Sequence, residues 1–259
     1  MIFLLTLIMK YLLFGLLLLG LECFAFGTSE CIAHRGNSSI FLENSLAALQ
    51  SAAEVKAHGV EFDIRHTLDE QAIILHDEEL QRVTKNSSRC PRKDKVNSLK
   101  FTDLRHCQLL NGEPIPTLET TLKILSNYPI KIFIEFKDNP TTADLLLIYK
   151  YYQTMPERVY FISFSATYLI WLRQEIHKMD IFDEATLLHL QSNYTLPTAF
   201  HGVNLQYNNI TAINIIELKK QNKKVGVWTV DNPSDIKKFI SLSVDFITTN
   251  YPTNCLNYL

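Results

Sequence analysis

Two short segments of the sequence, VEFDIR and IFIEFK, alternate apolar with charged residues. Successive side chains of a β-strand point to opposite faces, so Glu61 and Asp63 share one face of the first segment. Glu135 and Lys137 share one face of the second segment in the same way. If the apolar faces pack under helices, the three carboxylates and the lysine point into the interior of the fold.

Such a cluster needs compensation, because buried carboxylates are costly unless a cation neutralises them. Carboxylate oxygens are the ligands that a hard divalent cation such as Ca²⁺ or Mg²⁺ prefers. The alternative is a buried ion-pair network, for example between Glu135 and Lys137. The convergence of Glu61, Asp63 and Glu135 favours a metal site, and the sequence leaves the choice between Ca²⁺ and Mg²⁺ open.

Two histidines are placed where acid–base chemistry needs them. His34 closes the apolar segment CIA, and His76 follows the apolar segment AIIL and precedes Asp77. Imidazole gains and loses a proton near neutral pH, so a histidine pair beside a carboxylate cluster can serve as general base and general acid. A lone histidine at a strand end is more often structural, and the other histidines are interpreted in that way.

The elements that would position these residues alternate between strands and helices. Strands are expected over Glu30–His34, Val60–Arg65, Ile132–Lys137, Val159–Ser163, Ala185–Leu190, Gly202–Leu205, Val225–Val230 and Val244–Thr248. Helices are expected over Asn44–Ala57, Leu118–Asn127, Thr142–Gln153, Ala166–Lys178, Thr211–Asn222 and Pro233–Ser241. This order predicts one α/β domain folded as a TIM (β/α)₈ barrel. A polar insertion, Asp77–Pro116, follows the second strand, and Gln191–Phe200 is too short for a full helix.

Length and composition are those of a globular protein. The chain has 259 residues, of which 47% are hydrophobic and 20% charged, and this composition excludes a disordered or collagen-like protein. The formal net charge is −2, so no basic surface favours nucleic acid as a partner.

The first 25 residues form a leader with a composition of its own. Lys10 precedes an apolar block over Tyr11–Leu21, and Ala25 ends a short segment suited to signal peptidase. We expect cleavage after Ala25, which leaves the domain over residues 26–259. The alternative is an uncleaved leader that anchors the chain in a membrane. In both cases the domain is exported to the periplasm or the exterior.

Four cysteines remain after the leader: Cys31, Cys90, Cys107 and Cys255. An even number in an exported chain permits disulfides, with three ways of pairing four residues. Cys90 and Cys107 flank one polar segment and form the first pair to test. The alternative is four buried thiols, because a core of this size needs no disulfides.

Several short motifs follow one another from residue 33 to residue 252. They are AHRG (33–36), ENS (43–45), GVEFD (59–63), HDxxLxR (76–82), IPTLE (115–119), EFK (135–137), SF (163–164), VWTVD (227–231) and DFITTNYP (245–252). In this order they resemble the motifs of the glycerophosphodiester phosphodiesterases, over essentially the whole chain after the leader.

The resemblance implies a TIM barrel that hydrolyses glycerophosphodiesters, which are small molecules, to an alcohol and sn-glycerol 3-phosphate. It implies no obligatory protein partner. It gives each candidate site residue a role, as follows: His34 and His76 in acid–base catalysis, Glu61, Asp63 and Glu135 as ligands of one divalent cation, Arg35 and Lys137 as phosphate contacts, and Trp228 in the glycerol pocket.

The sequence departs from the family pattern at three places, and none of them removes a functional group. Leu42 replaces the usual proline before Glu43, the glycine-rich turn expected after Arg82 is absent, and Phe136 replaces the commoner isoleucine. The sequence does not distinguish attack by water from attack by a glycerol hydroxyl that forms a cyclic phosphate. Two other functions stay open, a lysophospholipase D-like enzyme and a non-catalytic binding protein.

Overall fold

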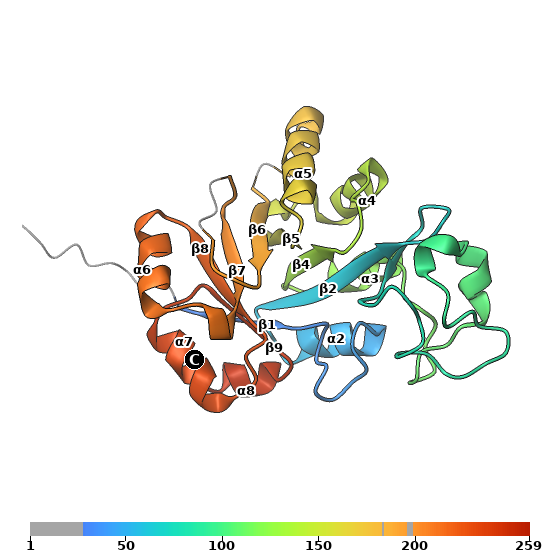
Figure 1. Ribbon diagram of the computed structural model, residues 1–259, viewed down its shortest axis with the longest axis horizontal. Helices are drawn as coiled ribbons and strands as arrows, with labels where there is room; N and C mark the ends of the chain where they lie inside the picture. Colours follow the sequence, from blue (N-terminus) through green and yellow to red (C-terminus); the bar gives the residue numbers. More distant parts are fainter. Residues whose placement is uncertain (1–27, 183, 196–198) are drawn as a thin grey trace, which may run out of the picture.

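The computed structural model describes residues 28–182, 184–195 and 199–259 (Figure 1). The predicted leader over residues 1–25 lies outside the described residues. No helix among those residues is both long and apolar enough to cross a membrane.

Eight parallel strands close into a barrel, as predicted (Figure 1). The neighbours follow the order β1–β2–β4–β5–β6–β7–β8–β9, and pairing of β9 with β1 completes the circle. The strands are β1 (Glu30–Ala33), β2 (Gly59–His66), β4 (Lys131–Phe136), β5 (Val159–Ser163), β6 (Thr186–Gln191), β7 (Gly202–Gln206), β8 (Lys224–Trp228) and β9 (Phe246–Thr249).

Helices cover the outside of the barrel. They are α2 (Leu46–Glu54), α3 (Leu118–Leu125), α4 (Thr142–Tyr152), α5 (Ala166–Met179), α6 (Ala212–Lys220), α7 (Pro233–Ser241) and α8 (Pro252–Leu256). Four of the six predicted helices, α2, α3, α4 and α6, are shorter than the sequence pattern suggests. A side-chain oxygen caps each of the first six helices, and the capping residues are Ser45, Thr117, Thr141, Ser165, Thr211 and Asn232. These caps accept from backbone N–H groups that lack a partner in the first turn, and so fix where each helix begins.

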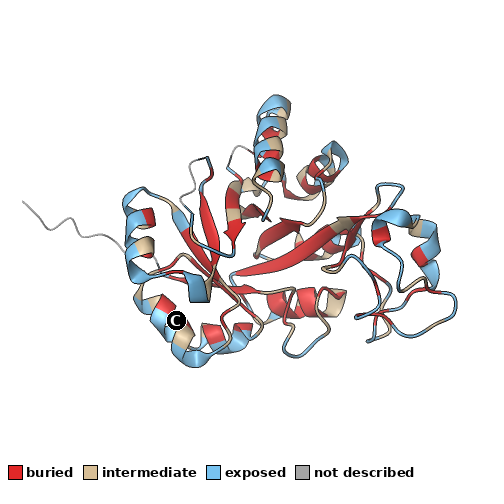
Figure 2. Cartoon of the chain, in the orientation of Figure 1, coloured by how far each residue is buried: buried red, intermediate tan, exposed pale blue. Residues whose placement is uncertain are grey.

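The barrel strands are largely buried, whereas the helices around them are exposed on their outer faces (Figure 2). The alternating pattern of the strands separates two apolar layers. Outward-facing residues such as Phe62 and Ile134 pack under the helices. Inward-facing residues such as Phe133, Tyr160 and Phe246 fill the barrel interior, where Phe133 stacks on Tyr160 with ring centroids 4.3 Å apart. The barrel is therefore solid below its carboxyl-terminal end, which leaves the strand ends to form a site.

The segment after β2 differs from the expected polar insertion. It begins with a further strand, β3 (Ala72–Ile74), which pairs antiparallel with β2, and it holds the short 3₁₀ helices η1 (Val96–Ser98) and η2 (Phe101–His106). The insertion also has a small apolar core, which includes Leu80. In Figure 1 it projects (green) from the side of the barrel away from α6.

Two disulfides join the four cysteines, so the alternative of four buried thiols is wrong. Cys90 pairs with Cys107 inside the insertion, as expected, and Cys31 on β1 pairs with Cys255 on α8. The second pair is 224 residues apart in sequence, and barrel closure is what brings its cysteines together.

Candidate active site

The three predicted carboxylates meet at the carboxyl end of two neighbouring strands. Asp63 on β2 lies directly beside Glu135 on β4 in the register of the sheet, and Glu61 lies one inward position below Asp63. Each of the three residues offers an oxygen within 4.8 Å of the others, and all three are buried. Strand alternation therefore places them in one cluster, as the sequence pattern predicts.

Asp63 is the most heavily contacted member of this cluster. Asn44 Nδ2 donates to Asp63 Oδ2 at 2.8 Å, and Arg35 Nε lies 3.3 Å from the same oxygen. Lys137 Nζ lies 3.3 Å from Asp63 Oδ1 and 2.5 Å from Glu135 Oε1. The ion pair between Glu135 and Lys137 that the sequence suggested as an alternative is thus present beside the carboxylate cluster.

The carboxylates nevertheless keep unused acceptor capacity. Glu61 Oε1, Asp63 Oδ1 and Glu135 Oε1 are buried and receive no hydrogen bond from the described residues. The ion-pair contacts of Lys137 with two of these oxygens lack hydrogen-bond geometry. Buried carboxylate oxygens that lie close together and accept no hydrogen bond are the ligand set that a hard divalent cation takes. The cluster therefore fits a metal ion.

The pKa values of the three carboxyl groups show the same need for positive charge. Burial, and then the charges of Asp63 and Glu135, raise the pKa of Glu61 well above its ordinary value. Burial and the charge of Asp63 raise the pKa of Glu135 to about 7. Burial would also raise the pKa of Asp63, but Lys137 and Arg35 outweigh it and hold that pKa at about 2. The raised pKa values of Glu61 and Glu135 show that the cluster favours additional positive charge.

His34 directly follows β1, and residues from the far end of the sequence hold its ring. Asn250 Oδ1 lies 2.8 Å from His34 Nδ1, and Asn250 Nδ2 donates to Asp231 Oδ2 at 2.7 Å. Because the Asp231 carboxylate only accepts, Asn250 turns its amide nitrogen toward Asp231 and its oxygen toward His34. His34 therefore donates from Nδ1, and its Nε2 keeps the lone pair that a general base needs.

The surroundings of His34 favour the neutral ring. Burial and the nearby Arg35 charge lower the pKa of His34 to about 4, although Asn250, Asp63 and Glu43 act in the opposite direction. His34 is thus unprotonated at neutral pH.

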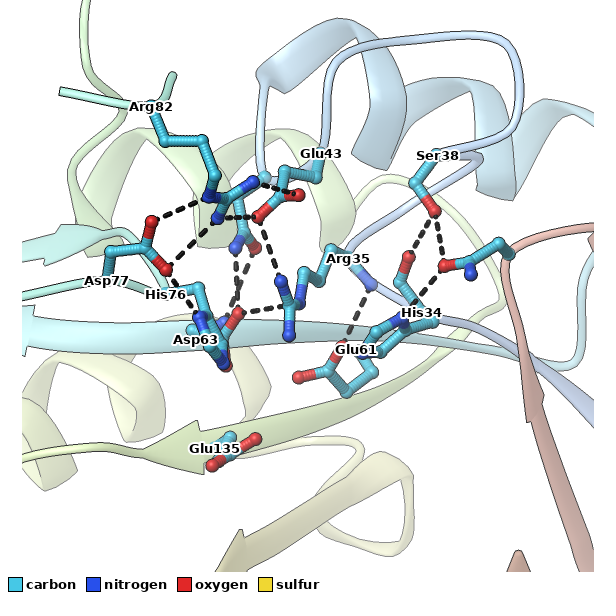
Figure 3. Close-up of polar contacts among 12 residues, drawn as sticks. His34, Arg35, Ser38, Glu43, Glu61, Asp63, His76, Asp77, Arg82 and Glu135 are labelled. Atoms are coloured by element: carbon cyan, nitrogen blue, oxygen red, sulfur yellow. Dashed lines mark hydrogen bonds and ion pairs between the residues drawn. The ribbon is translucent and has the colours of Figure 1, made fainter. Parts of the chain in front are cut away.

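A continuous chain of charged groups lies behind His76 (Figure 3). His76 Nδ1 is 2.8 Å from Asp77 Oδ1, and Arg82 Nε donates to Asp77 Oδ2 at 2.6 Å. The Arg82 guanidinium also donates to both oxygens of Glu43, each at 2.7 Å, and Glu43 accepts from Arg35 Nη1 at 2.9 Å. His76 and Arg35 are therefore held through one shared network.

A cavity of about 260 Å³ opens over these groups at the end of the barrel. Trp228 forms an apolar wall with Phe164, whose ring meets the indole edge-to-face at 5.5 Å between centroids. Seven of the eight predicted site residues line the cavity, and Asp63 lies buried beneath them; the seven are His34, Arg35, Glu61, His76, Glu135, Lys137 and Trp228.

Several polar residues of the site received no role from the sequence. Glu43, Asn44, Asp231 and Asn250 occur in the quoted motifs, but only the folded chain shows which groups they contact. Asn204 also lines the cavity and lies outside those motifs. No periodic or motif signal marks Asn204, since one polar residue in an otherwise apolar strand has many structural explanations.

Comparisons with known proteins identify the family of this chain. A model of the glycerophosphoryl diester phosphodiesterase family matches residues 34–254. The chain belongs to this family. A glycerophosphodiester phosphodiesterase of Caldanaerobacter subterraneus is 28% identical over 237 residues, which cover 87% of this chain and 96% of the relative.

Solved structures with low sequence identity share the fold. A glycerophosphodiester phosphodiesterase of Parabacteroides distasonis has a TM-score of 0.73 at 24% identity, over 89% of this chain and 96% of that one. An Oleispira antarctica phosphodiesterase, solved in complex with the product sn-glycerol-3-phosphate, has a TM-score of 0.74 at 21% identity with the same coverage. These likenesses support the assignment of a TIM barrel.

Proposed function

We propose that the protein hydrolyses glycerophosphodiesters to an alcohol and sn-glycerol 3-phosphate. One observation carries this proposal: His34, His76, Arg35 and Lys137 face a single cavity together with the buried carboxylate cluster. A phosphodiester anion needs positive charge around its oxygens, a base for the nucleophile and an acid for the leaving alcohol. Membership of the family and the activity named for the Caldanaerobacter relative support the same reaction.

Glu61, Asp63 and Glu135 would hold one divalent cation, Ca²⁺ or Mg²⁺. Their unpartnered buried oxygens support this assignment. When bound, such a cation supplies Lewis-acid neutralisation of the phosphate charge.

Arg35 and Lys137 bind the phosphate from two sides of the carboxylate cluster. The guanidinium presents a planar fork to two oxygens, whereas the Lys137 ammonium acts as a compact point charge. Glu43 and Asp63 fix the direction of the Arg35 fork. The phosphorus is thereby held in one orientation between the two histidines.

His34 and His76 then divide the proton transfers. Nε2 of neutral His34 takes the proton from the attacking hydroxyl, which belongs to water or to the glycerol of the substrate. The bond between phosphorus and the alcohol oxygen breaks, and protonated His76 gives its proton to that oxygen. If a glycerol hydroxyl attacks, the cyclic phosphate is opened by water in a second step, and the two histidines exchange roles.

Product analysis tests the proposal. The purified protein is incubated with glycerophosphocholine, glycerophosphoethanolamine or lysophosphatidylcholine after exhaustive chelation, and again with added Ca²⁺ or Mg²⁺. From glycerophosphocholine and glycerophosphoethanolamine we expect sn-glycerol 3-phosphate and the free alcohol, and only with a divalent cation. Full activity in excess chelator would contradict the metal assignment. A cyclic phosphate as the final product would favour the lysophospholipase D-like reading, and binding without turnover would favour the non-catalytic one.

We further propose that the domain functions outside the cytosol. Disulfides persist mainly in oxidising compartments, and the two disulfides of this chain support export. Amino-terminal sequencing of the protein recovered outside producing cells should begin at residue 26. A chain that retains residues 1–25 and sediments with membranes would instead support the anchor.

A further inference from the structure

Asn204 lies near the middle of β7 with its side chain inside the barrel. The residue is 1% exposed and lines the cavity, yet its Oδ1 accepts no hydrogen bond from the described residues. Gly226 on the neighbouring strand leaves the necessary room, because a Cβ at position 226 would lie 2.7 Å from that oxygen. The fold therefore accommodates a buried amide oxygen for which it provides no partner.

The position of Asn204 complements the carboxylate cluster. In the closed order of eight strands, β7 is four steps from β2 in either direction, so Asn204 faces Glu61 and Asp63 across the barrel. The indole nitrogen of Trp228 donates to the backbone carbonyl oxygen of Asn204 at 3.0 Å. When the phosphate of a diester lies at the carboxylate cluster, the substituent that enters the barrel mouth therefore extends toward Asn204.

Thr248 on β9 contributes a second unpaired group to the same cavity. It is 2% exposed, and its Oγ1 has no hydrogen-bond partner among the described residues. Ile162 and Leu190 supply apolar wall on the other side. Buried polar atoms in native proteins are nearly always paired, so two unpaired atoms in one cavity indicate a polar ligand.

We propose that Asn204, assisted by Thr248, hydrogen-bonds the free terminal hydroxyl of the glycerol group and thereby selects diesters whose glycerol carries no acyl chain. This inference rests on the proposed hydrolysis of glycerophosphodiesters. A hydroxyl donates a proton to Asn204 Oδ1, whereas an ester at the same carbon has no proton to donate. An acylated substrate leaves the amide oxygen unpaired and also has to place its chain beside it.

The size of the cavity agrees with this selection. Pockets for drug-sized ligands are roughly 300–1,000 Å³, and the cavity of about 260 Å³ is smaller. It suits a phosphorylated three-carbon polyol, with Trp228 and Leu190 against the carbon atoms.

Substrate analogues make the test specific to this contact. Asn204→Leu and wild type are compared on glycerophosphocholine, on 2-hydroxypropyl phosphocholine, which lacks the terminal hydroxyl, and on lysophosphatidylcholine. The variant should lose about tenfold or more in kcat/KM on glycerophosphocholine. It should change less than about twofold on the analogue, because the contact is already absent there. The ratio of kcat/KM on glycerophosphocholine to kcat/KM on lysophosphatidylcholine should be smaller in Asn204→Leu than in wild type by the same factor.

Two further variants control for folding and for general effects. Thr248→Val removes the second polar atom with little change of shape. It should lose less kcat/KM on glycerophosphocholine than Asn204→Leu does, and again change little on the analogue. Thr121→Val removes another buried hydroxyl without a partner, on α3 away from the cavity, and should leave all three substrates unaffected. The melting temperature of Asn204→Leu should not fall, since no hydrogen bond of Oδ1 is lost.

Equal losses on glycerophosphocholine and on the analogue, or no loss on either, would overturn the assignment of Asn204. If Asn204→Leu does not fold, the pattern of Thr248→Val decides in the same way. Wild type that hydrolyses none of the three substrates in the presence of divalent cation would contradict the proposed function itself, which is a separate outcome.

Discussion

His34 and His76 are held at Nδ1 by groups of different charge, and we infer their proposed roles from this difference. The neutral amide of Asn250 contacts His34, whereas the carboxylate of Asp77 contacts His76. A carboxylate stabilises an imidazolium and an amide does so far less. Burial lowers the pKa of His76 below its ordinary value, and Asp63 and Asp77 offset that effect only in part. His34 is thus the residue suited to be the base, and His76 the residue suited to be the acid.

The leaving group separates these two roles experimentally. Choline and glycerol are poor leaving groups that need a proton, whereas p-nitrophenolate leaves without one. His76→Ala should lose roughly 10²–10⁴-fold in kcat on glycerophosphocholine and far less on a p-nitrophenyl diester of glycerol phosphate. His34→Ala should be impaired on both substrates. Steady-state kinetics of the two variants measure this, and the reverse pattern would exchange the roles.

At the scale of elements, the loops after β8 and β9 meet behind His34. Asp231 follows β8 and Asn250 follows β9, and Asp231 accepts from the Asn250 backbone, from its side chain and from the Thr249 hydroxyl. Ser38, from the loop after β1, donates to Asn250 Oδ1 at 2.9 Å. Three strand ends therefore fix a single imidazole ring.

Exchanging the two loop residues should move the pH dependence of the reaction. The double variant Asp231→Asn with Asn250→Asp keeps the net charge but places the carboxylate directly against His34 Nδ1. An adjacent anion raises the pKa of a histidine by about 1 unit or more, above the wild-type value of about 4. The base is then protonated at a higher pH, so kcat/KM should fall off earlier on acidification and stay nearly unchanged at pH 8.

The other charges around His34 are Arg35, Asp63 and Glu43, and they are the same in both proteins. The single variant Asp231→Asn is the matched control. It leaves a neutral amide at position 250, so the pH at which kcat/KM falls on acidification should not rise. A pH profile of kcat/KM for the exchange variant that overlays that of wild type would mean that His34 is not the base.

At the scale of the whole molecule, the Cys31–Cys255 disulfide joins the beginning of the barrel to its last helix. It closes a loop of 224 residues, whereas Cys90–Cys107 closes one of 17. In the chain-entropy account these bonds stabilise the fold by about 5 and about 3 kcal/mol, respectively, because a longer loop restricts the unfolded chain more.

Removing each disulfide in turn tests this difference. Cys31→Ala with Cys255→Ala should lower the free energy of unfolding by about 2 kcal/mol more than Cys90→Ala with Cys107→Ala. Both double variants delete two buried sulfur atoms, so the cost of the cavities is similar. Urea denaturation under oxidising conditions measures the two losses. A larger loss for the pair in the insertion would show that local strain or packing, and not loop length, decides.

Local patterns in the sequence determine the barrel class and much of the candidate site. A period of two assigns Glu61, Asp63 and Glu135 to the inner face, because alternation along a strand needs no knowledge of its neighbours. The order of strands and helices then predicts a closed barrel, whose strand ends lie together. Their placement at the ends of apolar segments singles out His34 and His76, and the motif resemblance implies their role in acid–base catalysis.

Only the tertiary structure decides contacts between residues far apart in the chain. The register places Asp63 beside Glu135, and the circle of eight strands brings Asn250 to His34, 216 residues away. Closure also brings Cys31 to Cys255 and puts Asn204 opposite the carboxylate cluster. The physical reason is that such contacts depend on strand register and closure, which the pattern of any single segment leaves open.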